Sequence, residues 1–152
     1  MFSFLKKKRL LDNDDCERIV AAIRSVEAST TGEVRVYIES KCRYMDALER
    51  AKEIFSSLRM SLTEQHNAVL VYIALDDHQF AIYGDEKAYQ QFGGATFWQQ
   101  AAKRLLHFLK QGKITEGIVS CIQEMGDLLK LHFPFDPTIL KNELPDEIVF
   151  GK

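Results

Sequence analysis

Several features that mark whole classes of protein are absent from this chain of 152 residues. It contains no apolar run approaching the ~18–20 residues that a membrane-spanning helix requires. Basic residues are not in excess, since 20 Lys and Arg stand against 22 Asp and Glu and the net charge is -2. This balance argues against nucleic-acid binding, which needs a basic surface to displace counterions from phosphate. Internal repeats and low-complexity segments are also absent.

Cysteine is scarce, and its spacing indicates no bridge or metal site. The three cysteines, Cys16, Cys42 and Cys121, form no CxxC motif and their number is odd. A disulfide framework and a structural zinc site are therefore not expected. Each cysteine lies among apolar neighbours, which is typical of small buried hydrophobes in a reducing compartment.

The first residues have the wrong order for a signal peptide. Phe2, Phe4 and Leu5 come before the basic run 6–9, whereas a signal peptide places charge first and a long apolar stretch second. We therefore expect a cytoplasmic protein in which residues 1–11 are a basic N-terminal extension.

Hydrophobic periodicity predicts four long helices and three strands. Apolar residues recur at helical spacing in segments 13–28, 44–58 and 115–131, and in a further segment that opens near Thr96 and stops before Gly112. Segment 34–38 alternates in the manner of a strand. Residues 68–75 are continuously apolar, which is typical of a strand buried on both faces, and 80–83 form a returning strand.

The order of these elements predicts an α/β fold. A strand–helix–strand crossover favours parallel pairing of the first two strands, and the hairpin adds an antiparallel strand. The expected product is a three-layer α/β/α sandwich with a small mixed sheet, spanning residues 12–133 as a single domain. Residues 134–152 form an acidic tail with three prolines, and its apolar residues predict partial order.

Six short segments stand out by their order and spacing along the chain. These are Thr31-Gly32-Glu33-Val34-Arg35-Val36, Ala47-Leu48-Glu49-Arg50-Ala51, Asn67-Ala68-Val69-Leu70-Val71-Tyr72-Ile73-Ala74, Tyr83-Gly84-Asp85, Phe97-Trp98 and Glu143-Leu144-Pro145-Asp146-Glu147-Ile148. In these segments the sequence resembles the TPM domain family, named for a thylakoid lumen protein, a photosystem II repair protein and a nematode receptor accessory protein. The resemblance covers residues 12–150.

The resemblance carries expectations of its own. It implies a three-layer sandwich, in agreement with the periodicity. Plant relatives are acid phosphatases, some members bind calcium, and the nematode member modulates a receptor. Relatives accompany LemA-like proteins and longer TPM proteins, so a partner of that kind is implied. Most of these members are exported and membrane-tethered, whereas this sequence shows neither a signal peptide nor a C-terminal span.

Acidic residues flank the returning strand of the hairpin and supply the candidate site. Asp76 and Asp77 lie in the turn and Asp85 and Glu86 lie beyond the strand, so the pairs are ~17–20 Å apart. A parallel first strand would begin at the end that holds Asp85 and Glu86, which brings Glu33 to the same place. Glu33, Asp85 and Glu86 are therefore the candidate metal ligands.

Carboxylate oxygens suit a hard divalent cation such as Ca²⁺. Two or three carboxylates without a dedicated cage imply weak binding, on the order of 10⁻⁴ M or poorer. A structural alternative stays open. Glu33 in that case only flanks an edge, and Asp85 only caps a short helix beginning near Glu86.

Other polar groups lack the context that catalysis requires. Asp12, Asp14 and Asp15 precede a helix and follow no strand, whereas an aspartyl-phosphate nucleophile lies at the end of a buried strand. None of the four histidines has a histidine partner at helical spacing or a nearby cysteine: His66, His78, His107 and His132. We therefore assign no catalytic residue and no organic cofactor.

The sequence favours a non-enzymatic binding module for a divalent cation, a protein partner, or both. The alternative, implied by the family alone, is a weak acid-phosphatase-like hydrolase. Phosphoryl transfer needs cationic groups around the phosphoryl oxygens, and no Lys or Arg here is placed by a motif to supply them.

Overall fold

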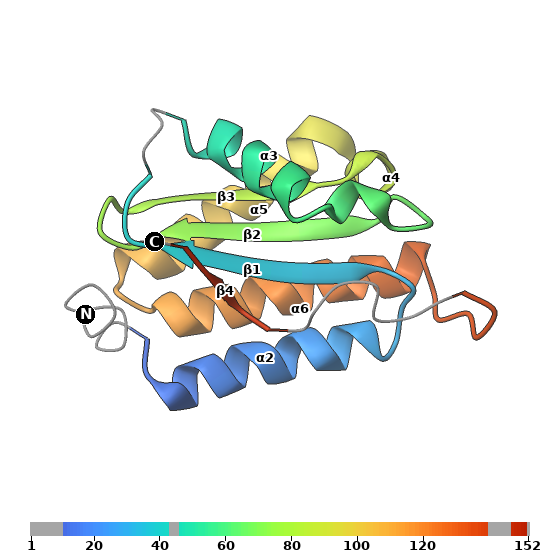
Figure 1. Cartoon of the computed structure of the whole chain (residues 1–152), viewed down its shortest axis with the longest axis horizontal. Coiled ribbons are helices and arrows are strands. Elements are labelled where there is room, and N and C mark those ends of the chain that lie inside the picture. The colour runs from blue at the N-terminus through green and yellow to red at the C-terminus, as the bar shows by residue number, and fades with distance from the viewer. Residues whose placement is uncertain (1–10, 43–45, 140–146, 152) are drawn as a thin grey trace.

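The chain forms the four long helices and three strands that the periodicity predicts, in that order, and adds a short helix and a fourth strand, as a computed structural model shows for residues 11–42, 46–139 and 147–151 (Figure 1). The helices are α2 (Asn13–Glu27), α3 (Ala47–Ser57), α4 (Glu86–Gln91), α5 (Gly94–Lys110) and α6 (Ile114–His132). The strands are β1 (Glu33–Glu39), β2 (Ala68–Ala74), β3 (Gln79–Gly84) and β4 (Val149–Phe150). Within the described ranges, no helix has both the length and the apolar character needed to cross a membrane.

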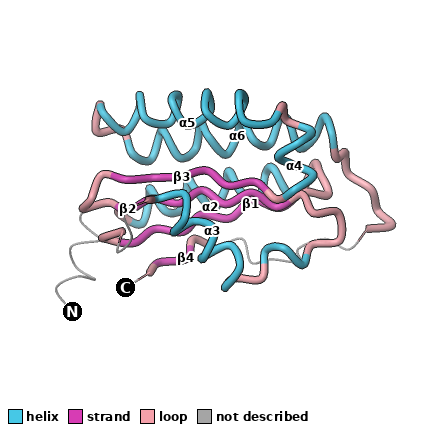
Figure 2. Tube along the Cα trace, turned by 90° about the horizontal axis from the view of Figure 1, so that it is seen from above, coloured by secondary structure: helices cyan, strands magenta, loops and turns pink. Residues whose placement is uncertain are grey.

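The four strands form one mixed sheet in the order β3-β2-β1-β4 (Figure 2). β1 and β2 are parallel, with Glu33 opposite Ala68, and β2 and β3 form the predicted antiparallel hairpin. All seven residues of β2 are buried, as its continuous apolar run indicates. Because β2 and β1 occupy the middle of the sheet, β3 is left as an outer strand.

Each face of the sheet is covered by helices, which gives the predicted three layers (Figure 1). The larger core joins alternate residues of β1, including Val34 and Val36, to apolar side chains of α2, α5 and α6. The smaller core packs Ile54 and Phe55 of α3 against Tyr72 of β2. Side chains alternate between the faces of a strand, so every strand in the middle of the sheet contributes to both cores. The expected α/β/α sandwich is confirmed.

Helix α5 begins earlier than the sequence pattern predicted. The Thr96 start is wrong, because Gly93 is the N-cap and the helix opens at Gly94. Both glycines have positive φ, 123° and 66°, which glycine adopts without steric cost because it has no Cβ atom. The predicted stop at Gly112 agrees with a helix that ends at Lys110, and Gly112 has φ 75°.

A short strand from the C-terminal residues completes the sheet, and the periodicity did not predict it. β4 pairs in parallel with β1, placing Val149 opposite Tyr37, and the Gly151 N–H donates to the Ile38 carbonyl at 2.8 Å. Two residues are too few to give a strand period, so only the contact with β1 reveals this element.

Candidate functional site

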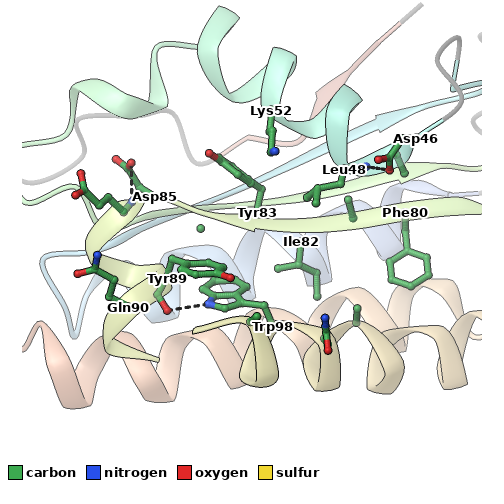
Figure 3. A pocket seen from close by; sticks show the side chains of 17 residues that line it. Asp46, Leu48, Lys52, Phe80, Ile82, Tyr83, Asp85, Tyr89, Gln90 and Trp98 are labelled. Carbon is green, nitrogen blue, oxygen red and sulfur yellow. Dashed lines mark hydrogen bonds between the residues drawn. The ribbon is translucent and has the colours of Figure 1, made fainter. Parts of the chain in front are cut away.

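A groove of about 670 Å³ runs along the outer edge of β3 (Figure 3). Side chains of α3 form one wall, and side chains of α4 and α5 form the other. Leu48 projects from the α3 wall and Tyr89 from the opposite wall, and they are 40% and 39% exposed. The volume falls within the ~300–1,000 Å³ range of ordinary ligand sites.

An aromatic stack fixes the floor of the groove at its α5 side. Trp98 lies between Tyr89 and Phe92, with ring centroids 6.1 Å and 5.5 Å apart and nearly parallel planes. Its indole N–H donates to the Tyr89 carbonyl at 3.1 Å. Trp98 is therefore held in one orientation, and its ring also lies against β3 at Gly84.

Gly84 is needed because the indole of Trp98 occupies the space that a side chain would fill. A Cβ atom at residue 84 would lie 2.5 Å from Trp98 Cη2. We expect Gly84→Ala to lower the free energy of unfolding by about 1–3 kcal/mol, as overpacking does. Urea denaturation followed by circular dichroism measures this change. Trp98→Leu alone should also lower the free energy of unfolding. In the double variant, however, the smaller leucine should relieve part of the loss that Gly84→Ala causes. If the two losses simply add, Trp98 does not clash with the new Cβ atom.

Acidic residues lie at both ends of the groove. Asp46 caps α3 by accepting from the Leu48 N–H at 3.0 Å. Asp85 caps α4 at the other end by accepting from the Glu86 N–H at 2.8 Å. Among the described residues that line the groove, Lys52 is the one basic side chain beside three carboxylates.

The three predicted site residues all lie at the same end of the sheet. The Asp85 N–H donates to the Ala68 carbonyl at 2.9 Å, and Ala68 lies opposite Glu33. Asp85 and Glu86 line the groove, but Glu33 does not, because β2 separates it from β3. Two strand spacings put the Glu33 and Asp85 backbones about 10 Å apart. Asp85 also caps α4, as the alternative interpretation with a purely structural role for Asp85 predicted.

Buried oxygen atoms gather in the loops at this end of the sheet. Asn67 is 1% exposed, and its amide nitrogen donates to Thr31 Oγ1 at 3.2 Å. Asn67 Oδ1 and Asp85 Oδ2 are both buried and receive no hydrogen bond from any described residue. His66 Nδ1 lies 3.5 Å from Asp85 Oδ2. In the described part of the chain, no three His, Cys, Asp or Glu side chains cluster closely enough to hold a metal.

A second polar cluster, under α3 at the other end of β1, was missed by sequence reasoning. Glu39 is 3% exposed and accepts from Arg50 Nε at 2.9 Å and Nη2 at 3.0 Å. The Tyr72 hydroxyl also donates to Glu39. The hydrogen bonds to Glu39 raise the pKa of Arg50, while burial and then the Glu39 carboxylate raise the pKa of Tyr72. These contacts fasten α3 to the sheet. Sequence reasoning did not pair these two residues, because no motif or spacing links Glu39 of β1 to Arg50 of α3.

Asp76 and Asp77 lie at the far end of the hairpin, where the sequence placed them. They border another opening, of about 590 Å³. Asp77 Oδ2 accepts from the Cys42 N–H at 2.7 Å, and the Asp76 N–H donates to the Ser40 carbonyl at 2.7 Å. Both residues therefore fix the loops at this end of the sheet.

The fold and the groove define a class of small three-layer α/β/α domains, and solved structures share this architecture. The BA42 protein of the psychrophilic bacterium Bizionia argentinensis is 35% identical, with a TM-score of 0.81 over 93% of this chain and 95% of that chain. The N-terminal domain of the cg2496 protein from Corynebacterium glutamicum has a TM-score of 0.62 at 15% identity, over 89% of this chain and 83% of that one. At that identity the second likeness shows the fold alone.

A match between this chain and a protein-family model identifies the family. The TPM domain model matches residues 5–128, and the chain therefore belongs to the TPM domain family, as the sequence resemblance predicted. No curated protein matches the chain.

Proposed function

We propose that this TPM domain is a binding module for a protein segment and that the groove along β3 is its binding surface. The observation that carries the proposal is the exposure of Leu48 and Tyr89 on opposite walls of one groove. Large apolar side chains exposed around a concavity are typical of interaction sites. Tyrosine and tryptophan are also enriched among the residues that dominate binding energy.

The charges around the groove favour a partner with positive charge. Asp46 lies at one end and Asp85 and Glu86 at the other, while Lys52 stands between them on the α3 wall (Figure 3). Complementary charges at a rim speed association and select among partners more than they raise affinity. An acidic groove with an apolar floor therefore matches a segment that mixes apolar and basic residues.

A peptide selection tests the groove as a binding surface. Peptides selected on the intact protein from a random library should quench or shift the fluorescence of Trp98, the sole tryptophan, because it forms the floor. Leu48→Glu should weaken binding of the selected peptides tenfold or more, since it puts a charge on the apolar wall.

The matched control is Leu131→Glu, which changes another exposed leucine on a helix. Leu131 is 71% exposed near the end of α6 and does not line the groove. This variant should bind the peptides as the parent does. Failure to select any peptide, or binding that ignores Leu48→Glu, would contradict the proposal.

A cation site at the Asp85 end is a second candidate, favoured by the buried oxygens described above. Asp85 Oδ2 and Asn67 Oδ1 are oxygen ligands of the kind that Ca²⁺ takes, and Glu33 and Glu86 lie at the same end of the sheet. The oxygens present fit a hard cation, whereas the small number of carboxylates implies weak affinity.

Calcium should then raise the melting temperature of the parent at millimolar concentration, because a ligand that binds the folded state stabilises it by mass action. Asp85→Asn should abolish this rise while it keeps the cap of α4, since asparagine caps nearly as well as aspartate. Asp46→Asn makes the same change at the cap of α3 and should leave the rise intact. Absence of any calcium-dependent stabilisation in the parent would rule out the cation site.

Hydrolysis of phosphomonoesters is the alternative activity, and the charges of the groove disfavour it. A phosphate ester is anionic, and the groove offers Lys52 against three carboxylates. We expect no turnover of a chromogenic phosphate ester with or without divalent ions. Turnover that Asp85→Asn removes would instead support a hydrolase.

A further inference from the structure

The outer edge of β3 presents backbone groups that pair with nothing in the described part of the chain. In an antiparallel pair, successive residues turn their N–H and C=O groups alternately toward the partner strand and away from it. The Asp85 N–H bonds to Ala68, its opposite residue, so Tyr83 and Ala81 also face β2. The groups of Phe80, Ile82 and Gly84 therefore point outward, into the groove.

This edge lacks the devices by which proteins usually protect an outer strand. β3 reads Gln79–Gly84 without a charged residue or a proline, and it extends over six residues, about 20 Å. The walls formed by α3 and α5 rise on either side of it, as Figure 3 shows. A segment added to this edge would therefore lie between the two walls.

We propose that the groove binds an extended, basic-ended segment of a partner protein as an added strand on β3. Main-chain hydrogen bonds to the outward groups supply affinity, and alternate side chains enter the two walls. The inference rests on the proposed function, because it names the occupant of that same groove and its mode of binding.

The two sides of the groove dictate the side-chain pattern of the segment. Phe80 and Ile82 point toward the α5 side, where Trp98 and Tyr89 favour apolar residues (Figure 3). Acidic groups lie at the two ends of the groove, and Lys52 lies between them on the α3 wall. The complementary segment therefore has apolar residues at alternate positions and a basic residue at each end.

The same charges disfavour a second copy of this chain as the occupant. Pairing two β3 edges antiparallel would bring the Asp46 end of one groove against the Asp85 and Glu86 end of the other. Like charges placed together across an interface are unfavourable. A basic-ended partner meets no such repulsion.

The probe is the peptide lysine-leucine-threonine-leucine-lysine, blocked at both termini. Its sequence is the same from either end. Either strand direction then places a lysine at each end of the groove and both leucines on one side. On binding, the amide N–H groups of Phe80, Ile82 and Gly84 should become protected from hydrogen exchange, while those of Ala81 and Tyr83 are already bonded to β2. A peptide with glutamate in place of lysine should bind at least tenfold more weakly.

Backbone methylation separates strand addition from docking by side chains alone. N-methylation of both leucines removes the two N–H groups that face β3 in antiparallel pairing, whereas methylation at threonine removes one that faces away. In parallel pairing the threonine N–H faces β3 and the two leucine N–H groups face away. Strand addition therefore predicts that one set weakens binding about tenfold or more and the other leaves it unchanged.

The outcomes distinguish this inference from the proposed function. Binding that shifts Trp98 fluorescence but leaves the three outward amides unprotected, or that responds equally to both methylation sets, overturns strand addition and preserves the groove as a binding surface. Protection of those amides before any peptide is added means that the edge is already covered by a second copy or by another part of this chain, and also overturns it. Failure of the probe and of every selected peptide to bind overturns both.

Discussion

Replacing Val71 by aspartate is expected to leave the chain unfolded. Val71 lies in the middle of β2, between Val36 of β1 and Ile82 of β3, and its exposed fraction is 0%. An isolated carboxylate in such a core costs several kcal/mol or more. The whole stability of a domain is only about 5–15 kcal/mol, so this single change removes most or all of it.

Circular dichroism and a thermal melt measure the effect directly. Val71→Ala is the matched control, because it removes two methyl groups without adding charge. We expect it to remain folded and cooperative with a loss of about 2–3 kcal/mol, in line with other truncations in a core. A Val71→Asp variant that is soluble and melts cooperatively near the parent temperature would show that β2 is not the central buried strand.

Removing the guanidinium of Arg50 should produce the second largest loss. Arg50→Met keeps much of the apolar stem that packs on the sheet but takes the bidentate donor away from the buried Glu39 carboxylate. Breaking a buried ion pair from one side typically costs 3–5 kcal/mol. We expect about 3 kcal/mol, the lower end, because the Tyr72 hydroxyl still donates to Glu39.

A double-variant cycle tests this explanation. Glu39→Gln removes the buried negative charge, so the combination with Arg50→Met should lose less stability than the two single changes added together. Strictly additive losses would indicate that Arg50 acts only through packing.

The elements and their order could be predicted because each rests on a local pattern. The period in segment 13–28 gave α2 within one residue, and the apolar run from Ala68 gave the buried strand β2. Parallel pairing of β1 with β2 followed from the crossover rule, which depends only on the order of elements. The start of α5 was missed because Gly93 and Gly94 open the helix with positive φ, and the neighbouring residues in the sequence carry no pattern that predicts those conformations.

The positions of the three candidate site residues followed from the sequence, whereas their role as metal ligands stays a prediction. Asp85 and Glu86 were singled out as acidic residues that follow the hairpin, and both line the groove. Glu33 was placed correctly at their end of the sheet, yet β2 intervenes between it and the groove. Leu48, Trp98 and Tyr89 were not considered as binding residues, because an apolar residue at helical spacing looks the same whether it enters a core or a groove.

The sequence by itself determined the four long helices, the first three strands, their order and the burial of β2, because these depend on the period of apolar side chains. It also determined the parallel and antiparallel pairings of those strands, because these follow from the order of the elements. Only the tertiary structure decided that β3 is an open edge between two helical walls, that Glu39 meets Arg50 under α3, and that Val149 and Phe150 form a fourth strand beside β1. These features join residues that are far apart in the sequence or too few to show a period. Their positions follow from how the helices pack on the two faces of the sheet, and no local sequence pattern predicts that packing.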